Sequence, residues 1–502
     1  MSLLQNNPRL PKILFLSILS LDLIMLSFPP LSFSYFVFFA FIPLFILERT
    51  LQSQISFRLW TGGIFLFFSF YVLTGFIPYY SLFLYFFSSI VLAVFLFAPF
   101  FFYPILKKRI KGSVSRAFVL GSIAVLTVFI QNHSFLVFPG GIFLPIAKIS
   151  FFLGVNKLFG VYFLVFALYF INDLLYSFFF LKEKKSLVFC FSFIFLWIGL
   201  SLVSNWHYQK DKTLKYSAAV LQGSIPVKEF RKEAEKAESL KDEKLLKDFW
   251  EDLDRESLRI MDVYSELVSD VRGKPFIIIP EAVFPYSYSL IESYFYEKSY
   301  IKEAPIISGI NKDEGNQVYN AIVFLDAYKN SRFFYKKQSL VPFVESGKYA
   351  SGKDYLRPIE FESLKWGPAI CLENVRPGHF KELRKQGVDV FLVVTDDAGF
   401  KKTPLAEIHS WFSILRAAEN NAYLIHAAQS GPTFIVDQNG KTSESSALFE
   451  KKVYYGDFYP VQKLSFYAQI DDIWIILFIL FLNLGGWLYF KKIKIRKNNE
   501  IN

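Results

Sequence analysis

Long apolar runs constrain the fold of this chain more than any other feature. A helix needs about 20 mostly apolar residues to cross the hydrocarbon core of a bilayer, and such runs occur before residue 205 and again after residue 470. They predict eight membrane spans, near 12–29, 31–48, 58–77, 81–105, 116–137, 157–181, 186–204 and 470–490. The stretch 138–156, with Pro139-Gly140-Gly141 and Pro145, is expected to be re-entrant or interfacial, because irregular backbone at that depth must be covered by protein or line a cavity.

The composition divides the chain into parts. Hydrophobic residues make up 53% of the 502 residues and 61 residues are Phe, yet the section between the seventh and eighth runs is rich in charge. We therefore expect a seven-span domain at 1–205, an extramembrane domain at 206–469, a final helix at 470–492 and a basic tail at 493–502.

The net charge of +11 comes largely from short basic clusters between the apolar runs. These clusters lie at 107–116, 182–185 and 491–497, and with eight spans all of them fall on the side of the two termini. Positive residues concentrate in cytoplasmic loops, so both termini are expected in the cytoplasm and 206–469 outside. This distribution also argues against nucleic acid as a partner.

The extramembrane section alternates between two kinds of pattern. Short β-rich runs occur at 216–222, 275–280, 304–309, 319–326, 366–371, 388–395, 422–428 and 433–437, and helical stretches at 227–270, 287–300, 376–386 and 403–421. Alternation of this sort predicts an α/β sandwich whose helices cover the sheets. Gly347 and Gly352 suggest a flexible loop beyond Phe343, which we interpret as a lid.

Three side chains stand where strands are expected to end: Glu281, Lys337 and Cys371. Each has a simpler interpretation alone, as a loop carboxylate, a surface lysine and a packed thiol. Together they are the parts that a thiol nucleophile needs, because a free thiol has a pKa near 8.5 and reacts as the thiolate. Glu281 would act as general base and then general acid, and Lys337 would stabilise both the thiolate and an oxyanion.

Other reactive residues do not suggest a competing site. Cys190 lies in an apolar run and is interpreted as a space-filling residue. The histidines, at 133, 207, 379, 409 and 426, offer no clear partner for Cys371. No His, Cys, Asp and Glu set has metal-ligand spacing, so we predict no metal and no cofactor.

The trio resembles, in order and context, the Glu-Lys-Cys triad of the nitrilase superfamily, and the membrane layout resembles the bacterial apolipoprotein N-acyltransferases. The matching pieces are Phe159-Gly160-Val161-Tyr162, Asn172, the run from Val220 to Pro226, Tyr319-Asn320-Ala321, the run from Tyr335 to Phe343 with Glu345, Cys371-Leu372-Glu373, Asp397-Ala398 and Gly431-Pro432-Thr433. Three pieces depart from the family: Asp396-Asp397-Ala398-Gly399-Phe400, Phe138-Pro139-Gly140 and Val344-Glu345-Ser346-Gly347, which lack aromatic residues that the family carries.

The resemblance implies a nitrilase-like αββα sandwich and a two-step acyl transfer in the bacterial inner membrane, with the α/β domain on the periplasmic side. Cys371 would take an acyl chain from a phospholipid as a thioester and pass it to the α-amine of the diacylglyceryl-cysteine of an apolipoprotein, which predicts ping-pong kinetics. Glu345 and Glu373 would support the site. A monomer is expected.

Two other readings stay open. A membrane-anchored nitrilase-like amidase or hydrolase would use the same trio with water as the acceptor. A non-enzymatic transporter or assembly factor would need intramembrane charges that form a pathway, and the predicted spans offer little beyond Asp22 and Asp173.

Overall fold

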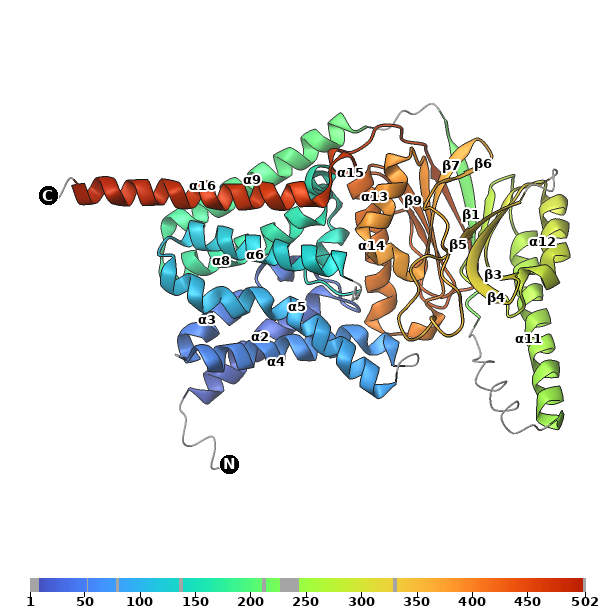
Figure 1. The fold of residues 1–502 in the computed structure, drawn as a ribbon, viewed down its shortest axis with the longest axis horizontal. Helices are drawn as coiled ribbons and strands as arrows, with labels where there is room; N and C mark the ends of the chain where they lie inside the picture. The colour runs from blue at the N-terminus through green and yellow to red at the C-terminus, as the bar shows by residue number, and fades with distance from the viewer. Residues whose placement is uncertain are drawn as a thin grey trace. The chain divides into compact units, whose positions relative to one another are not determined.

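The structure, a computed structural model, describes residues 9–51, 53–77, 81–134, 139–209, 214–225, 243–327 and 332–499 (Figure 1). It contains two compact units. The membrane unit comprises Met1–Thr74, Leu82–Gln209 and Ser465–Asn502, and the α/β unit comprises Gly75–Ser81 and Lys210–Leu464. Phe138, Pro226 and residues 227–242 of the helix expected at 227–270 lie outside the described residues.

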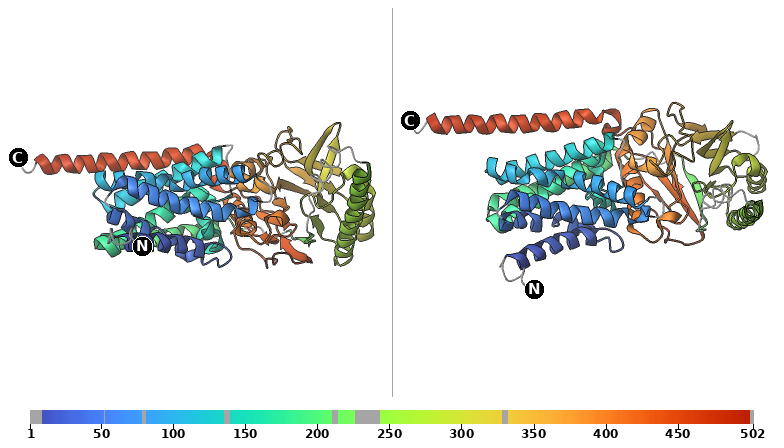
Figure 2. Two further views of the ribbon diagram at one scale, coloured as in Figure 1. Left: turned by 90° about the horizontal axis from the view of Figure 1, so that it is seen from below. Right: turned by 60° about the horizontal axis from the view of Figure 1, so that its bottom comes forward.

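The membrane unit is a bundle of apolar helices that run side by side (Figure 2). Within the described ranges, seven helical spans are long and apolar enough to cross a membrane. They are formed by α2 (Leu10–Ser27), η1 (Ser34–Phe38) with α3 (Ile42–Leu51), α4 (Gln54–Val72) with η2 (Leu73–Phe76), α5 (Leu82–Arg109), α6 (Ser113–His133), α8 (Val161–Leu181) and α9 (Lys184–His207). The apolar part of α16 (Asp472–Asn499) is shorter, Asp472–Gly485. The predicted membrane domain is confirmed in type and roughly in the number of its spans.

The irregular segment before α8 consists of short turns, as its Pro and Gly content indicates. These are η3 (Leu144–Lys148), η4 (Ser150–Val155) and α7 (Asn156–Phe159), and most of their residues are buried. Gly154 permits the tightest approach, since a Cβ there would lie 2.1 Å from the carbonyl oxygen of Ser201 on α9. Burial against neighbouring helices is what allows such backbone inside an apolar bundle.

Asp173 is buried between helices of this unit instead of lying in a polar pathway. It accepts hydrogen bonds from the Arg116 guanidinium, with Nε–Oδ2 and Nη2–Oδ1 both 2.9 Å, and one from the Tyr103 hydroxyl at 3.2 Å. A paired charge with its hydrogen bonds made is the form in which ions persist in an apolar interior. These hydrogen bonds join α5, α6 and α8.

The α/β unit contains two mixed β-sheets. The six-stranded sheet has the order β11-β1-β2-β3-β4-β5 and the five-stranded sheet the order β10-β9-β8-β7-β6. The strands are β1 (Tyr216–Gln222), β2 (Phe276–Ile279), β3 (Ile306–Glu314), β4 (Gln317–Leu325), β5 (Arg332–Lys336), β6 (Ile359–Phe361), β7 (Leu364–Ile370), β8 (Val390–Thr395), β9 (Tyr423–Ala428), β10 (Phe434–Val436) and β11 (Lys452–Phe458). Strands β1, β2 and β3 are parallel, as are β7, β8 and β9.

The layers follow the order helix, sheet, sheet, helix, which confirms the predicted sandwich. Helices α11 (Glu243–Ser269) and α12 (Tyr288–Lys302) cover the six-stranded sheet, and α13 (Pro377–Lys385) and α14 (Pro404–Asn420) cover the five-stranded one (Figure 1). One apolar core lies beneath α11 and α12. A second core joins the two sheets through side chains such as Ile278, Trp366 and Leu392. The continuous apolar runs of the central strands arise because both of their faces are buried.

Three strands lie outside the predicted β-rich runs: β6, β11 and β5, of which only the end before Lys337 is expected from the sequence. Each pairs on only one side or is only three residues long, and their charged or exposed residues hide the pattern. The stability of such edge strands comes from pairing with a neighbour, which a local sequence window does not reveal.

Candidate active site

The residues predicted to form the site follow strands that point in one direction. Glu281 follows β2 and Cys371 follows β7, each a member of a parallel set. Strands β3 and β5 both run antiparallel to β4, so Lys337, after β5, lies at the same edge of the six-stranded sheet as Glu281. Ligand and reaction sites of α/β sheets gather at such carboxyl ends.

Lys337 forms the centre of a buried charge cluster. Its Nζ lies 3.2 Å from Oε1 of Glu281 and 2.9 Å from Oε1 of Glu345, and its side chain is fully buried. Asn320 of β4 donates through Nδ2 to both carboxylates, at 2.6 Å to Glu281 and 3.2 Å to Glu345. The ammonium and the amide therefore hold the two carboxylates in place from one side.

Backbone amides hold the same carboxylates from the other side. Asp396 N, at the end of β8, donates to Oε2 of Glu281 at 2.8 Å, and Val341 N donates to Oε2 of Glu345 at 2.7 Å. The Glu281 carboxylate thus touches strand ends from both sheets. A Cβ on Gly309 of β3 would lie 2.5 Å from Cα of Glu281, so only glycine permits this backbone approach.

Glu373 ties the lysine segment to the cysteine segment. Its buried carboxylate accepts from Gln338 N at 2.7 Å, Ser339 N at 3.0 Å and Ile370 N at 2.8 Å, and from the Tyr335 hydroxyl at 2.9 Å. Hydrogen bonds to an ionised acceptor are about twice as strong as neutral ones. The residue after Lys337 and the residue before Cys371 are consequently fixed to one carboxylate.

Cys371 occupies a strained turn between β7 and the 3-10 helix η5 (Cys371–Val375). Its φ is +47°, in the left-handed region that non-glycine residues seldom adopt. Such outliers cluster at functional sites, where the surrounding structure holds them. Cys371 is partly buried as a residue, whereas Glu281 and Lys337 are buried.

The electrostatics of the trio favour a neutral thiol and a charged lysine at rest. Burial raises the pKa of the Cys371 thiol well above its ordinary value, the Glu281 carboxylate raises it further, and the Lys337 ammonium opposes both. Burial alone would lower the pKa of Lys337, but Glu281 and Glu345 raise it well above its usual value. Cys371 therefore interacts electrostatically with both Glu281 and Lys337, so the structure brings the three predicted residues together.

Several residues beside the trio were not singled out by the sequence. Asn320 appeared only within a matching piece, and Asp396 only as a departure; burial raises the pKa of the Asp396 carboxyl to about 7, with Glu281 adding to the shift. His409, on α14, lies against the cysteine turn, with Nε2 at 3.1 Å from the Cys371 carbonyl oxygen and Nδ1 at 3.3 Å from Asp397 Oδ1. Nothing in the spacing of a lone histidine indicates this contact.

Asp397, His409 and His426 form the group of potential metal ligands found among the described residues. One ligand-type atom of each lies within 4.8 Å of the others. Direct hydrogen bonds already account for the contact between Asp397 and His409, and burial lowers the pKa of His426 to about 3, so this ring is neutral. We interpret the group as a hydrogen-bonded network, and the absence of a metal stays a prediction.

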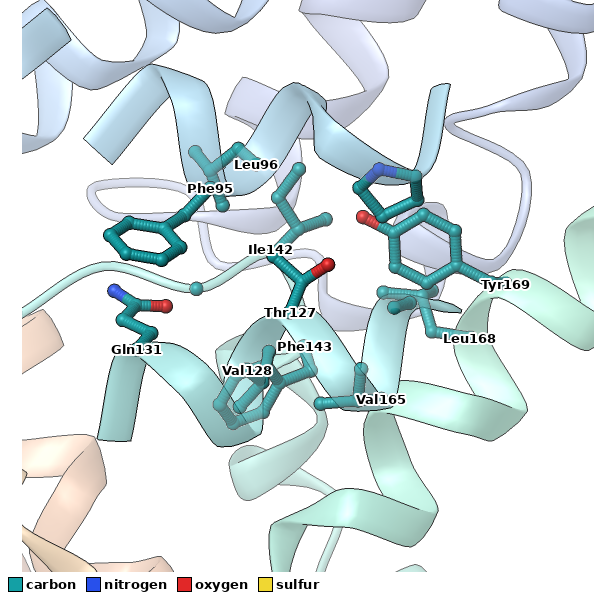
Figure 3. Close-up of a pocket in the computed structure, with 13 residues that line it drawn as sticks. Phe95, Leu96, Thr127, Val128, Gln131, Ile142, Phe143, Val165, Leu168 and Tyr169 are labelled. Atoms are coloured by element: carbon teal, nitrogen blue, oxygen red, sulfur yellow. The ribbon is translucent and has the colours of Figure 1, made fainter. Parts of the chain in front are cut away.

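A separate apolar cavity lies within the membrane unit (Figure 3). It is lined mainly by aliphatic and aromatic side chains of α5, α6, α8 and the segment 141–143, with the Gln131 amide toward one end and the Tyr169 ring toward the other. Gly140 precedes this segment, and a Cβ there would lie 2.8 Å from the Leu92 side chain. The family's aromatic residue at this position would therefore require its neighbours to move.

The lid predicted at Gly347 and Gly352 stays a prediction. Val344 and Glu345 donate backbone hydrogen bonds to the Val341 carbonyl, and Gly352 N donates to the Lys337 carbonyl at 2.8 Å. Phe343, with φ +64°, is 67% exposed at the start of this loop.

Much of the α/β unit is similar in sequence to proteins of a known family. Residues 301–461 match the carbon-nitrogen hydrolase family. The apolipoprotein N-acyltransferase of Synechocystis is 24% identical over 43% of this chain and 45% of its own length, and that of Rickettsia prowazekii is 31% identical over 36% and 40%. These alignments span less than half of each relative.

A carbon-nitrogen hydrolase crystal structure from Helicobacter pylori covers 48% of this chain and 88% of its own, at 12% identity and a TM-score of 0.36, which is too low to add to the fold described above. The sequence comparisons confirm the resemblance inferred from the motifs: residues 301–461 match the carbon-nitrogen hydrolase family, and the chain is similar to the apolipoprotein N-acyltransferases.

Proposed function

We propose that this chain is a membrane acyltransferase that moves a fatty acyl chain from a phospholipid, through a thioester on Cys371, to the α-amine of the diacylglyceryl-cysteine of an apolipoprotein. The observation that carries the proposal is the buried Glu281–Lys337–Glu345 cluster beside the strained Cys371 turn. Seven apolar helical spans in the same chain favour a lipid as the donor. The inner membrane, with the α/β unit on the periplasmic side, is the location this function requires.

The first step forms the acyl-enzyme. Sγ of Cys371 attacks the carbonyl carbon of a phospholipid ester while its proton passes to the Glu281 carboxylate. The resulting oxyanion is stabilised by the Lys337 ammonium, which stays charged. The ester C–O bond then breaks, Glu281 returns the proton to the departing oxygen, and a lysophospholipid leaves.

The second step transfers the acyl chain. The α-amine of the acceptor attacks the thioester carbonyl, Glu281 removes a proton from the attacking nitrogen, and the C–S bond breaks. The proton returns to the Cys371 thiolate, which restores the neutral thiol. No group outside the chain and its two substrates is needed to balance either step, and the shared intermediate gives ping-pong kinetics.

Intact-mass measurement tests the proposal. Purified wild type, Cys371→Ala and Cys190→Ala would each be incubated with phospholipid in the absence of an acceptor. Cys190→Ala is a matched control, because the chain has two cysteines and Cys190 is buried in α9. We expect a hydroxylamine-labile acyl adduct on wild type and Cys190→Ala, and none on Cys371→Ala.

Adding a synthetic diacylglyceryl-cysteine peptide then separates the transferase from a hydrolase. A transferase clears the adduct in proportion to the peptide and yields an N-acylated peptide. Clearance at the same rate without peptide, with release of free fatty acid, would establish water as the acceptor. An adduct that persists on Cys371→Ala would overturn the proposal.

A further inference from the structure

His409 lies in an unusual position for a buried histidine, because both of its ring nitrogens face acceptors. Nε2 is 3.1 Å from the carbonyl oxygen of Cys371, and Nδ1 is 3.3 Å from Oδ1 and 3.4 Å from Oδ2 of Asp397. The ring and the carboxylate are both almost completely buried. A neutral imidazole carries one N–H and can satisfy only one of these acceptors, whereas an imidazolium donates to both.

We propose that Asp397 and the His409 imidazolium are a buried ion pair that positions Cys371, by donating to its carbonyl oxygen and holding the nucleophile in its left-handed turn. The inference rests on the proposed function in assigning Cys371 as the nucleophile. Asp397 and His409 are positioning residues, since neither is placed against substrate.

The surrounding contacts support a rigid attachment of the cysteine turn to α14. Asn374 of η5 donates through Nδ2 to the His409 carbonyl at 3.0 Å, and Ser413 Oγ donates to Asn374 Oδ1 at 3.2 Å. The side chain and the backbone of His409 therefore both bind η5. Because Cys371 sits at φ +47°, the turn needs such external bonds to persist.

The charges around the ring are consistent with an imidazolium. Thr395 Oγ1 donates to Asp397 at 2.8 Å, which orients the carboxylate toward the ring. Burial alone would lower the pKa of His409, but Asp397 and the Cys371 carbonyl raise it above its ordinary value, with Glu281 adding to the rise. His426 of β9 is a further titratable neighbour; it is neutral and its Nδ1 lies 2.8 Å from Ser413 Oγ.

Variants of His409 separate positioning from simple packing. His409→Gln keeps an amide N–H donor group without charge, His409→Leu removes both donors, and Asp397→Asn removes the counter-ion. His379→Gln is the matched control, because this second buried histidine contacts only a backbone carbonyl, that of Pro368 at 2.8 Å, among its hydrogen-bond partners in the described chain. All variants would carry Cys190→Ala so that alkylation reports Cys371 alone.

Two readouts are measured on each full-length protein, with thermal melting as the fold check. The first is the rate of Cys371 alkylation by iodoacetamide, and the second is kcat and KM for acyl transfer from phospholipid. We expect His409→Leu and Asp397→Asn to lower kcat by about tenfold or more with KM within about twofold, and to slow alkylation. His409→Gln should fall between these and His379→Gln, which should match wild type.

Equal alkylation rates and kcat values in all four variants would overturn the proposal, as would a loss confined to KM. A stoichiometric transition metal in the purified wild type would also overturn it, because a metal on Nδ1 is incompatible with an imidazolium. If His409→Leu fails to fold, His409→Gln and Asp397→Asn decide the matter. If wild type forms no acyl-enzyme, the proposed function fails, while the alkylation rates still test positioning.

Discussion

Removing the charge of Lys337 should destabilise the α/β unit sharply. Lys337→Met leaves the Glu281 and Glu345 carboxylates together in a buried site from which their shared cation has gone. At separations of 3.2 and 2.9 Å, Coulomb's law with an effective dielectric constant of about 20 gives roughly 5–6 kcal/mol of gross attraction per pair. Desolvation offsets much of this, and loss of one partner of a buried pair typically costs about 3–5 kcal/mol.

The assay is the thermal unfolding midpoint of the purified full-length chain, followed by a signal assigned to the α/β unit, such as hydrogen exchange in its central strands. For a domain of this size a loss of 1 kcal/mol lowers the midpoint by about 2–4 °C, so we expect a fall of about 10 °C. Lys337→Met combined with Glu345→Gln should recover part of this loss, because the second change removes one of the two unpaired charges.

The matched control is Lys365→Met, which removes a half-exposed lysine 3.5 Å from Glu360. Exposed pairs contribute about 0–1 kcal/mol, so its midpoint should stay close to wild type. The reasoning is refuted if Lys337→Met is as stable as this control, or if adding Glu345→Gln lowers the midpoint further.

Three more predictions follow from the site. Gly309→Ala should abolish acyl-enzyme formation with the chain still folded, because the added Cβ meets the Glu281 backbone at 2.5 Å; intact mass reports this, and an unchanged yield would contradict it. Glu373→Gln should slow Cys371 alkylation and lower the unfolding midpoint, since an amide nitrogen would face backbone N–H donors that the carboxylate now accepts. Asp396→Asn should stabilise the chain more at pH 8 than at pH 5. The folded-state pKa of Asp396 is raised to about 7, so the wild type loses stability as pH rises from the unfolded-state pKa toward about 7. Equal differences in unfolding midpoint between variant and wild type at both pH values would exclude this.

The parts of the fold that the sequence predicts are those with a local signature. The apolar runs of membrane length and the buried central strands can each be recognised from their own residues. The sequence therefore predicts their positions closely. The edge strand β11 pairs with β1 far along the chain, as in the pairing of Tyr216 with Phe458. The edge strands β5 and β6 form hairpins with the neighbouring strands β4 and β7, but their exposed and charged residues hide the strand pattern.

The site divides in the same way. Glu281 and Cys371 each follow an apolar strand, and the carboxyl ends of parallel strands meet at one edge, so their proximity follows from topology. The contact of His409 with Cys371 depends on how α14 lies on the five-stranded sheet, and the role of Asn320 depends on the register of β4 against β5. Residue spacing alone does not indicate the tilt of a helix on a sheet or the register of two paired strands.

The charge of the site at rest favours a neutral Cys371 thiol, and the proposed reaction would convert this thiol into a thiolate only when a substrate is bound. Lys337 is flanked by two carboxylates, so the cluster holds one excess negative charge before any thiolate forms. A permanent thiolate would add a second negative charge in a buried space, and the raised pKa of Cys371 reflects that cost. In the proposed reaction, passing the proton from Cys371 to Glu281 would move the charge without changing its total. Lys337 would stay paired with Glu345, and we expect the thiolate to form only when an ester is bound to accept it.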